Sequence, residues 1–300
     1  MYTAIATNGT LITREVAKRI KDSGAGYVQI SLDGAKPETH DGFRGVSGAF
    51  EKTIKEIKNC VEEEIFVEVS TTGTKYSKDE IPEIIELCEQ LKVPWWMLYN
   101  FIPSGRGRFI AENDLEPTER EEILRYLYQR LKTNNKVEVL STAPQFARVS
   151  LQVEKEAKEK AEDNLIIVPT HFYNTRLYEQ LVELSDFIGG CGAGRVYCAL
   201  DPDGTITPCV FFPLTVGNIR NDNFEEVWGN PVFKELRNRD KLKGQCGQCE
   251  YRYVCGGCRA RAYGYFGDYL APDPGCINNL NLWEKLKNDR KVSEPHSIEI

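Results

Sequence analysis

The sequence predicts an α/β protein in two parts: a parallel sheet with helices, followed by a small cysteine-rich α+β module. Two observations predict this fold class. Strand and helix patterns alternate regularly up to residue 132, as they do in βαβ units. Eight of the ten cysteines lie within residues 191–276. With 300 residues, the chain is long enough for one large domain or two smaller ones.

Composition excludes several classes of protein. Hydrophobic residues make up 41% and charged residues 28% of the chain, and the net charge is -7. Basic residues are dispersed among acidic ones, so we expect no nucleic-acid partner. No run of eighteen apolar residues occurs, which predicts no membrane span. The first residues lack a basic segment followed by a long apolar stretch, so the cytoplasm is the expected compartment.

The elements of the first part follow from residue spacing. A helix is expected at 11–24, ending at Gly24, and a strand at 27–34, closed by the turn residues Asp33 and Gly34. The next helix, 48–63, carries apolar residues at three- and four-residue steps. The remaining expected elements are a strand at 65–73, a helix at 77–91, a strand at 94–102, a turn at 104–108 and a helix at 116–132.

Polar or glycine-rich segments stand where the predicted strands end. They are residues 7–10, 31–34, 70–73 and 102–107. In parallel sheets, catalytic and ligand-binding residues lie where strands end and loops begin. Each segment taken alone is also an ordinary turn sequence.

The rest of the chain has weaker patterns. Residues 150–165 read as a charged, solvated helix, and His171 as a structural histidine. Residues 278–300 read as a short helix and a polar tail. The expected organisation is a sheet domain at 1–140, a helical linker at 141–187, a cysteine-rich module at 188–277 and the C-terminal helix and tail at 278–300.

The cysteines fall into two classes. Cys60 and Cys88 lie on helical apolar spacing and are expected to be buried small hydrophobes. The other eight are Cys191, Cys198, Cys209, Cys246, Cys249, Cys255, Cys258 and Cys276. Because no secretory signal is visible, so many thiols favour metal over disulfides.

The local spacing leaves the metal open. Residues 197–209 read as a β-hairpin whose turn, "DPDG", brings Cys198 and Cys209 towards each other. The segment "CGQCEYRYVCGGC" then holds two Cys-x-x-Cys pairs. One four-cysteine zinc site, two zinc sites and two iron–sulfur clusters all satisfy the spacing.

The whole cysteine pattern resembles the SPASM domain, the C-terminal twin-cluster module of radical S-adenosylmethionine (SAM) enzymes. Cys191, Gly204 and Cys209 are followed by C-x2-C-x5-C-x2-C and a last cysteine. The usual SPASM form has three residues in the last short gap, and this chain has two. "TNGTLIT", "VQISLDG" and "FIPSGRG" look like successive strand ends of the radical SAM partial barrel. The resemblance covers about residues 3–110 and 188–277.

The resemblance implies a partial (β/α) barrel and two interleaved [4Fe–4S] clusters. It assigns Cys191, Cys198, Cys209 and Cys258 to the first cluster, and Cys246, Cys249, Cys255 and Cys276 to the second. The two Cys-x-x-Cys pairs would therefore not form one site, because Cys258 crosses over. Full cysteine ligation leaves no iron open to substrate, so electron transfer is the implied role.

The resemblance also implies a SAM-binding rim at the strand ends. The residues it places there are Asn8, Ser31, Asp33, Thr72 and Ser104, together with Thr7, Thr71, the backbone at Ile102–Pro103 and Arg44. Radical SAM chemistry needs a Cys-x3-Cys-x2-Cys loop, which this sequence does not contain. We therefore expect the first two βα units of the family to be missing, through truncation, a mis-started frame or a split enzyme. SAM and a third [4Fe–4S] cluster would bind only with that part supplied.

Several segments most resemble the branch of the superfamily that trims side chains of siroheme-derived tetrapyrroles in alternative heme or heme d1 synthesis. These segments are "FIPSGRG", "VPTHFY", "GGCGAGRVYCAL" and "CEYRYVCGGCRARAYGYFGDYLAPDPGC". A tetrapyrrole carries carboxylates, for which Arg106, Arg108 and Arg195 are candidate contacts. The implied electron donor is a ferredoxin or flavodoxin. The alternatives are a peptide maturase, a non-catalytic iron–sulfur electron carrier and a zinc-stabilised interaction protein.

Overall fold

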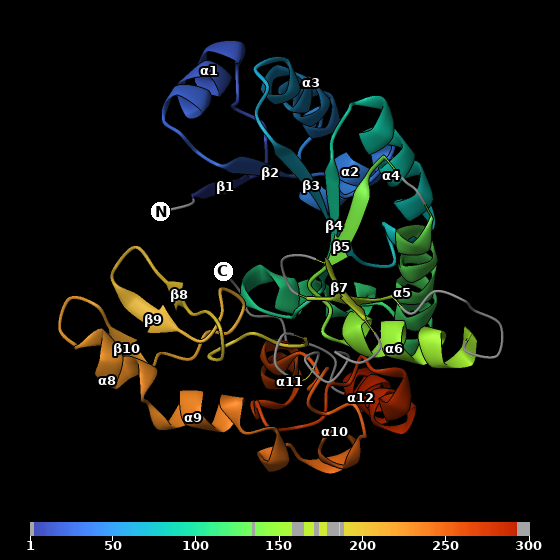
Figure 1. The fold of residues 1–300 in the computed structure, drawn as a ribbon, viewed down its shortest axis with the longest axis vertical. Helices are drawn as coiled ribbons and strands as arrows, with labels where there is room; N and C mark the ends of the chain where they lie inside the picture. The colour runs from blue at the N-terminus through green and yellow to red at the C-terminus, as the bar shows by residue number, and fades with distance from the viewer. Residues whose placement is uncertain are drawn as a thin grey trace.

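The centre of the fold is a five-stranded sheet in which neighbouring strands follow chain order and every pair is parallel (Figure 1). The computed structural model describes residues 3–133, 136–157, 165–170, 174–178, 186 and 189–292. The strands are β1 (Ala4–Thr7), β2 (Tyr27–Ser31), β3 (Val67–Gly73), β4 (Trp95–Asn100) and β5 (Glu138–Ser141). Parallel strands that follow chain order and alternate with helices are the arrangement of a (β/α) barrel. Because β1 and β5 are not paired with each other, the barrel is open and therefore partial. The predicted fold class is confirmed.

Side chains alternate between the two faces of this sheet. Val28 and Ile30 of β2 are fully buried in the core, whereas Gln29 and Ser31 are half-buried on the other face. Ser31 lies opposite Ser70 of β3. The sheet therefore has an apolar face towards its helices and a face with polar residues on the other side.

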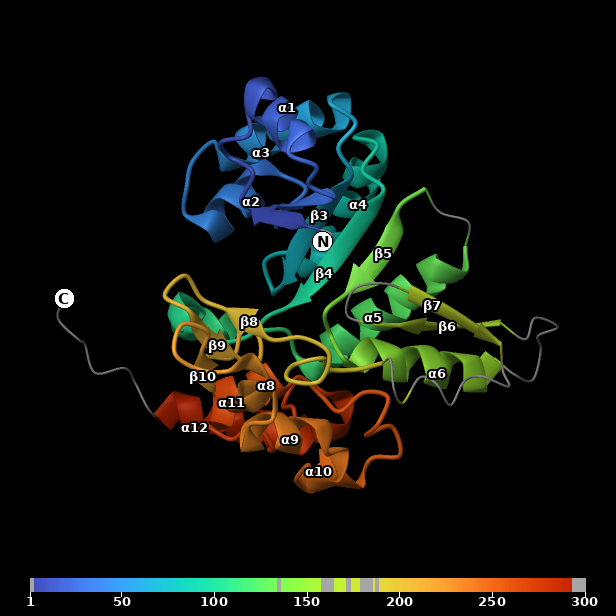
Figure 2. The same ribbon diagram turned by 60° about the vertical axis from the view of Figure 1, so that its left-hand side comes forward.

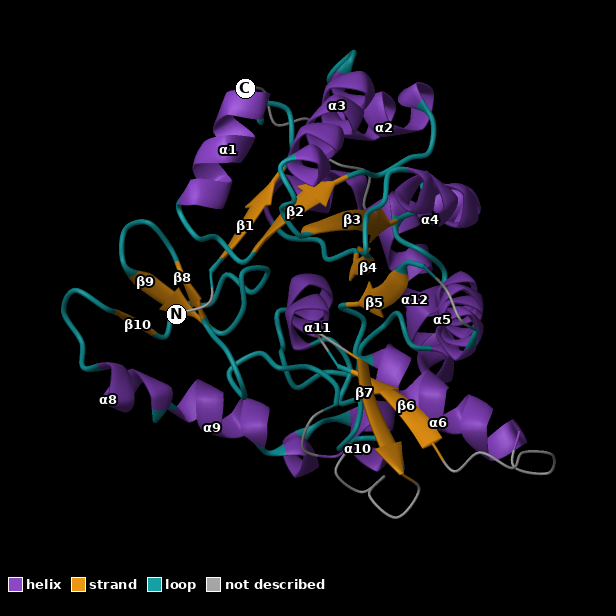
Figure 3. Ribbon diagram, turned by 45° about the horizontal axis from the view of Figure 1, so that its top comes forward, coloured by secondary structure: helices purple, strands orange, loops and turns teal. Residues whose placement is uncertain are grey.

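Helices lie around the outer face of the sheet, as Figure 3 shows. They are α1 (Arg14–Asp22), α2 (Pro37–Arg44), α3 (Ala49–Glu62), α4 (Ile81–Gln90) after the 3-10 turn η1 (Lys78–Glu80), and α5 (Pro117–Lys132). Local sequence fixes their starts. The Thr13 hydroxyl caps α1 by accepting from the Val16 amide over 3.3 Å. Pro117 opens α5, where Glu116 and Glu119 form a capping box.

Cys60 and Cys88 are both fully buried in this core, as predicted. Burial raises the pKa of the Cys60 thiol to about 11. Both thiols therefore stay protonated at neutral pH and pack as small hydrophobes.

Two segments of the sheet domain differ from the prediction. Residues 37–44 form α2, which the sequence analysis missed although Pro37 stands at a typical first helical position. The expected turn at 104–108 is instead the start of a 3-10 segment, η2 (Gly105–Asn113).

The expectation of a helical linker at 141–187 is wrong for residues 165–169 and 174–178, which form strands. After β5, the chain forms α6 (Gln145–Ala157) and then the strands β6 (Leu165–Pro169) and β7 (Asn174–Tyr178), which pair antiparallel. Arg148 and Glu154 of α6 are buried rather than solvated, because their charges have partners inside the protein: Arg148 pairs with Glu121, and Glu154 accepts from Tyr128 over 2.7 Å. His171 lies outside the described residues.

The cysteine-rich module packs on one side of the sheet domain, next to α6 (Figure 2). Its elements are β8 (Ala199–Leu200), β9 (Thr205–Thr207), β10 (Gly217–Asn218), α8 (Phe224–Trp228), α9 (Pro231–Arg237), η4 (Arg239–Lys241), α10 (Gly244–Gln248), α11 (Arg259–Phe266), η5 (Ile277–Asn279) and α12 (Leu280–Val292). The predicted hairpin is present, since β8 pairs antiparallel with β9. Among the described residues, no helix is long and apolar enough to cross a membrane.

Candidate metal centre

Four cysteines line one cavity of the module. They are Cys246, Cys249, Cys255 and Cys276. Cys246 and Cys249 come from α10 and its C-terminal end, Cys276 from the residue before η5, and Cys255 from the loop between α10 and α11. These are the four residues that the sequence analysis assigns to the second cluster.

Cys191, Cys209 and Cys258 line another cavity. Cys198 is half-buried and packs against the same core as these three cysteines. This core lies next to the sheet domain, because Ile102 and Thr142 line the cavity too. These four cysteines are the predicted first group: three of them line this cavity, and Cys198 lies on the adjoining core.

The "CGGC" turn sends neighbouring cysteines to different cavities. Gly256 has φ +65° and Gly257 φ +62°, both in the left-handed region that favours glycine. A Cβ on Gly256 would lie 1.0 Å from Nη1 of Arg239. The chain therefore reverses between Cys255 and Cys258, and their side chains line separate cavities.

The donor set is chemically suited to an iron–sulfur cluster, which takes four thiolate ligands. Four thiols line one of the cavities, and three line the other. Backbone amides point at sulfur: Gly257 donates to Sγ of Cys255, and Asp273 to Sγ of Cys246, each over 3.4 Å.

Burial acts against free thiolates at these sites. It raises the pKa of Cys209 to about 11 and that of Cys276 to about 12. Without a metal, these thiols stay protonated at neutral pH. Metal binding would release their protons, so affinity for the metal should fall as the pH falls.

The two cysteine groups are joined by direct contacts. Arg239, which is 4% exposed, donates from Nη2 to the carbonyl of Cys191 over 2.8 Å and from Nη1 to that of Cys255 over 3.3 Å. The Cys191 amide also donates to the Cys255 carbonyl over 3.2 Å. One residue of each group is therefore held by the same guanidinium.

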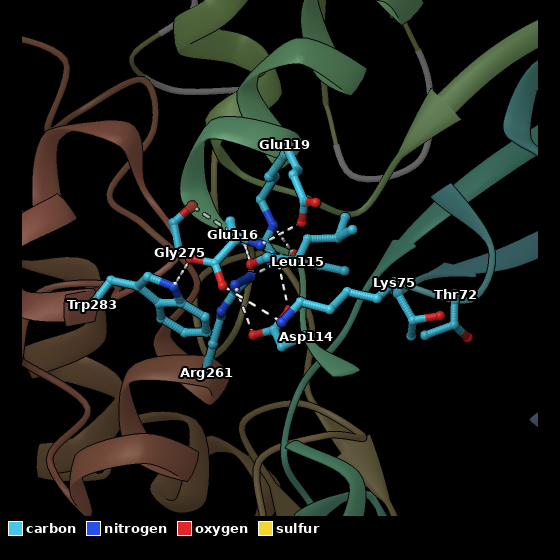
Figure 4. A network of polar contacts seen from close by, with 12 residues as sticks. Thr72, Lys75, Asp114, Leu115, Glu116, Glu119, Arg261, Gly275 and Trp283 are labelled. Atoms are coloured by element: carbon cyan, nitrogen blue, oxygen red, sulfur yellow. Dashed lines mark hydrogen bonds and ion pairs between the residues drawn. The ribbon is translucent and has the colours of Figure 1, made fainter. Parts of the chain in front are cut away.

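A buried ionic network fastens the module to the sheet domain (Figure 4). Arg261 of α11 donates from Nη2 to Asp114 over 3.0 Å and from Nη1 to Asn100 over 2.7 Å. Arg120 of α5 pairs with the other oxygen of Asp114 over 2.6 Å. Arg120, Asp114 and Arg261 are at most 2% exposed, so removing one partner of this network would leave a buried charge unpaired at the junction.

The predicted SAM-rim residues lie at the strand ends, but several have structural partners. Asp33 is 1% exposed, accepts from the Thr72 amide over 2.8 Å and pairs with Arg44 over 2.5 Å. Asn8 accepts from the amide and hydroxyl of Thr10, as in an ordinary turn. Ser31 ends β2, half-buried on the polar face.

The remaining rim candidates differ in burial and in the face they occupy. Ser104 is half-buried at the start of η2, and Thr7 accepts from the Gly9 amide over 3.1 Å. The expectation that Thr71 and Thr72 face the same rim is wrong, because neighbouring residues of a strand point to opposite faces. Thr71 is fully buried, donates to the Leu32 carbonyl and accepts from Trp96 Nε1.

The three arginines predicted to contact substrate carboxylates lie in two different parts of the structure. Arg106 and Arg108 are exposed on η2. Arg195 is half-buried and donates to the Gly189 carbonyl over 3.1 Å, beside the first cysteine group.

Comparison with known proteins identifies the family. The radical SAM superfamily matches residues 1–88, and the SPASM iron–sulfur cluster-binding domain matches residues 191–250. An AdoMet-dependent heme synthase of Methanosarcina barkeri is 38% identical over 275 residues, which cover 91% of this chain and 73% of that protein. The chain belongs to the radical SAM family. A pre-heme d1 synthase of Dinoroseobacter shibae is 30% identical over 285 residues, covering 91% of this chain and 66% of that protein.

Solved radical SAM structures share the fold. The structure titled "Native anSMEcpe with bound AdoMet" aligns with a TM-score of 0.62 at 18% identity, over 97% of this chain and 76% of that one. The partial barrel and SPASM module are thus the architecture of the family. Membership in it implies iron–sulfur clusters and the use of SAM.

The sequence analysis missed the buried charges of this radical SAM chain. Asp273 is fully buried, and Arg148, Arg259 and Arg261 are at most 1% exposed. A residue's burial depends on what packs against it from elsewhere in the chain, so local spacing carried no signal for them.

Proposed function

We propose that the eight cysteines bind two [4Fe–4S] clusters, with Cys191, Cys198, Cys209 and Cys258 on the first and Cys246, Cys249, Cys255 and Cys276 on the second. The single observation that carries this proposal is the partition of seven of the eight cysteines between two cavities, with Cys198 packed on the core beside the first group. Amide donors to Sγ of Cys246 and Cys255 support it, since such bonds stabilise thiolate ligands.

The proposed chemistry of the bound clusters is electron transfer, because four thiolate ligands leave no iron free to bind substrate. The protein's own residues would exclude water and fix the two sites relative to each other. Arg239 and the Cys191–Cys255 backbone hydrogen bond would do the latter. We propose a ferredoxin or flavodoxin as the external electron donor.

The proposed substrate class is a siroheme-derived tetrapyrrole whose side chains are trimmed, as in alternative heme or heme d1 synthesis. Support comes from the similarity to the heme synthase and the pre-heme d1 synthase. Arg106 and Arg108 are exposed and could contact substrate carboxylates. SAM would bind at the rim that contains Asn8, Ser31, Asp33, Thr72 and Ser104. SAM cleavage also needs the family's Cys-x3-Cys-x2-Cys loop, a spacing absent from these 300 residues.

Metal analysis after anaerobic purification tests the cluster proposal. We expect about eight irons and eight acid-labile sulfides per chain, the capacity of two four-iron clusters. Stoichiometric zinc without sulfide would overturn it and leave a structural zinc module. About four irons would mean that only one group of cysteines binds a cluster.

Titration with iron coproporphyrin tests the substrate proposal. We expect a saturable shift of the porphyrin absorbance with the wild-type chain, and weaker binding after Arg106→Gln combined with Arg108→Gln. The iron content of that variant should match the wild type, because neither arginine lines a cavity that contains cysteines. Absence of binding by the wild-type chain would favour the alternative, a peptide substrate.

A further inference from the structure

Arg148 is a cation in the wall of the cavity that the second group of cysteines lines, although it belongs to α6 and not to the cysteine-rich module. It lines this cavity together with Cys246, Cys249, Cys255 and Cys276. It is 1% exposed and is one of the largest fully buried side chains. The matched SPASM segment begins at residue 191, more than forty residues further along the chain.

One end of the guanidinium is held firmly. Nη1 and Nη2 both donate to the carboxylate of Glu121 on α5, the Nη1 bond being 3.1 Å long, and Nη1 also donates to Gln152. A two-pronged arginine–carboxylate pair fixes orientation as well as position. Arg148 therefore has a defined place at the cavity rather than a mobile one.

The Nε–H group of Arg148 is buried and has no hydrogen-bond partner in the protein. Buried N–H donors in native proteins almost always have partners, and an exception calls for an explanation such as a bound group. Here the donor belongs to a residue of the cavity wall. A sulfur-containing anionic group in the cavity would supply the missing acceptor.

Arg148 places a buried positive charge in the same cavity wall as Cys255 and Cys276.

We propose that Arg148 is part of the second cluster's site, where its charge and its Nε–H donor raise the reduction potential of that cluster selectively. This inference rests on the ligand assignment proposed above. The physical reason is that a cluster gains negative charge on reduction, so a nearby cation and a hydrogen bond to sulfur stabilise the reduced form. The sheet domain would thereby set a property of a cluster held by the module.

The test is a redox titration of the anaerobic holoprotein followed by EPR, which separates the reduced clusters. The variants are Arg148→Gln and Arg148→Lys, and Cys249→Ser identifies which signal belongs to the second cluster. We expect the midpoint potential of the second cluster to fall in R148Q and, by a smaller amount, in R148K, which keeps the charge but loses the Nε–H donor. The first cluster should keep its potential in both.

Arg125→Gln is the matched control. Arg125 also contacts Glu121, over 3.4 Å, but its main partner is Glu156 and its side chain is 37% exposed. R125Q should leave both potentials unchanged. If R148Q loses the second cluster, the midpoint potential of that cluster in R148K tests the proposal instead, since R148K retains a buried cation.

Three results would overturn the inference or its basis, and they can be told apart. A wild-type chain without two clusters defeats the ligand assignment. If two clusters are present but the midpoint potential of the second cluster is unchanged in R148K and R148Q, the role of Arg148 is wrong and the ligand assignment stands. Equal shifts at both clusters, or a shift in R125Q, would mean that Arg148 has no selective contact with the second cluster.

Discussion

The backbone amide of Cys258 donates to Oδ2 of Asp273 over 2.8 Å, and Asp273 in turn donates from its own amide to Sγ of Cys246 over 3.4 Å. One fully buried acidic residue therefore contacts a cysteine of each group. Gln145 of α6 donates to the same Oδ2 over 2.6 Å. Asp273 is thus a shared support for both cavities and for the sheet domain.

Replacing Asp273 with asparagine should lower the stability of the protein by about 3 kcal/mol, the usual cost of leaving a buried charge unpaired. The variant loses the negative charge that lies 3.5 Å from Arg261 Nε and places an amide among N–H donors. Urea denaturation of the anaerobic protein measures the loss of stability. The number of irons bound per chain should also fall in this variant. Asp268→Asn is the control, because Asp268 pairs with Lys243 at the surface and should contribute less than about 1 kcal/mol. Equal losses in the two variants would contradict the role given to Asp273.

The crossover of Cys258 gives a second prediction. Cys258→Ser should remove the first cluster and keep the second, whereas Cys249→Ser should do the reverse, because the two thiols line different cavities. Each variant should hold about four irons instead of about eight. EPR of the reduced proteins should show different remaining signals. The same remaining signal in both variants would mean that the Cys-x-x-Cys pairs form one site.

The sequence predicted the features that depend on local spacing. The strand–helix alternation predicted β2, β3 and β4, and the turn residues of the 197–209 segment predicted the β8–β9 hairpin. The grouping of cysteines was available only through the resemblance to a family, because spacing alone allowed zinc or iron. In the structure, Gly256 and Gly257 supply the physical reason for that grouping, since their positive φ angles separate two nearby thiols.

Features that depend on contacts between distant segments could not be predicted in this way. The β6–β7 hairpin was hidden in a stretch of mixed polar and apolar residues that fits either structure. The charges of α6 suggested a solvated face, and the structure buries Arg148 against Glu121, 27 residues away. Arg261 meets Asp114 across 147 residues, a pairing that no local pattern encodes.

Asp114→Asn should weaken the junction between the two parts of the chain. It leaves Arg120 and Arg261 without their shared carboxylate in a buried site, at a cost of about 3 to 5 kcal/mol. Thermal or urea unfolding measures the loss, and limited proteolysis should show new cleavage between sheet domain and module. Glu62→Gln is the comparison, because its pair with Arg14 is solvent-exposed and should contribute less than about 1 kcal/mol. An Asp114 variant as stable as the Glu62 variant would show that the network is not needed for docking.

Glu68 gives a prediction about pH. It lies on β3, is 1% exposed, and accepts a hydrogen bond from Gln29. Burial raises the pKa of Glu68, and the weaker opposing effect of Gln29 does not cancel it. The folded state therefore binds this proton more tightly than the unfolded state, in which the pKa is about 4.3. Its contribution to stability is present below that value and is lost as the pH rises through the folded-state pKa.

Glu68→Gln keeps the shape of the side chain and removes its ionisation. The variant should be more stable than the wild type at pH 8, and the difference should narrow as the pH falls towards 5. Urea midpoints across this range measure it. Glu89→Gln should behave in the opposite way, because Lys136 lowers the pKa of Glu89 at the surface and the charged form is the favoured one. A Glu68 variant whose midpoints follow the wild type at every pH would show that Glu68 does not ionise in the folded protein over this range.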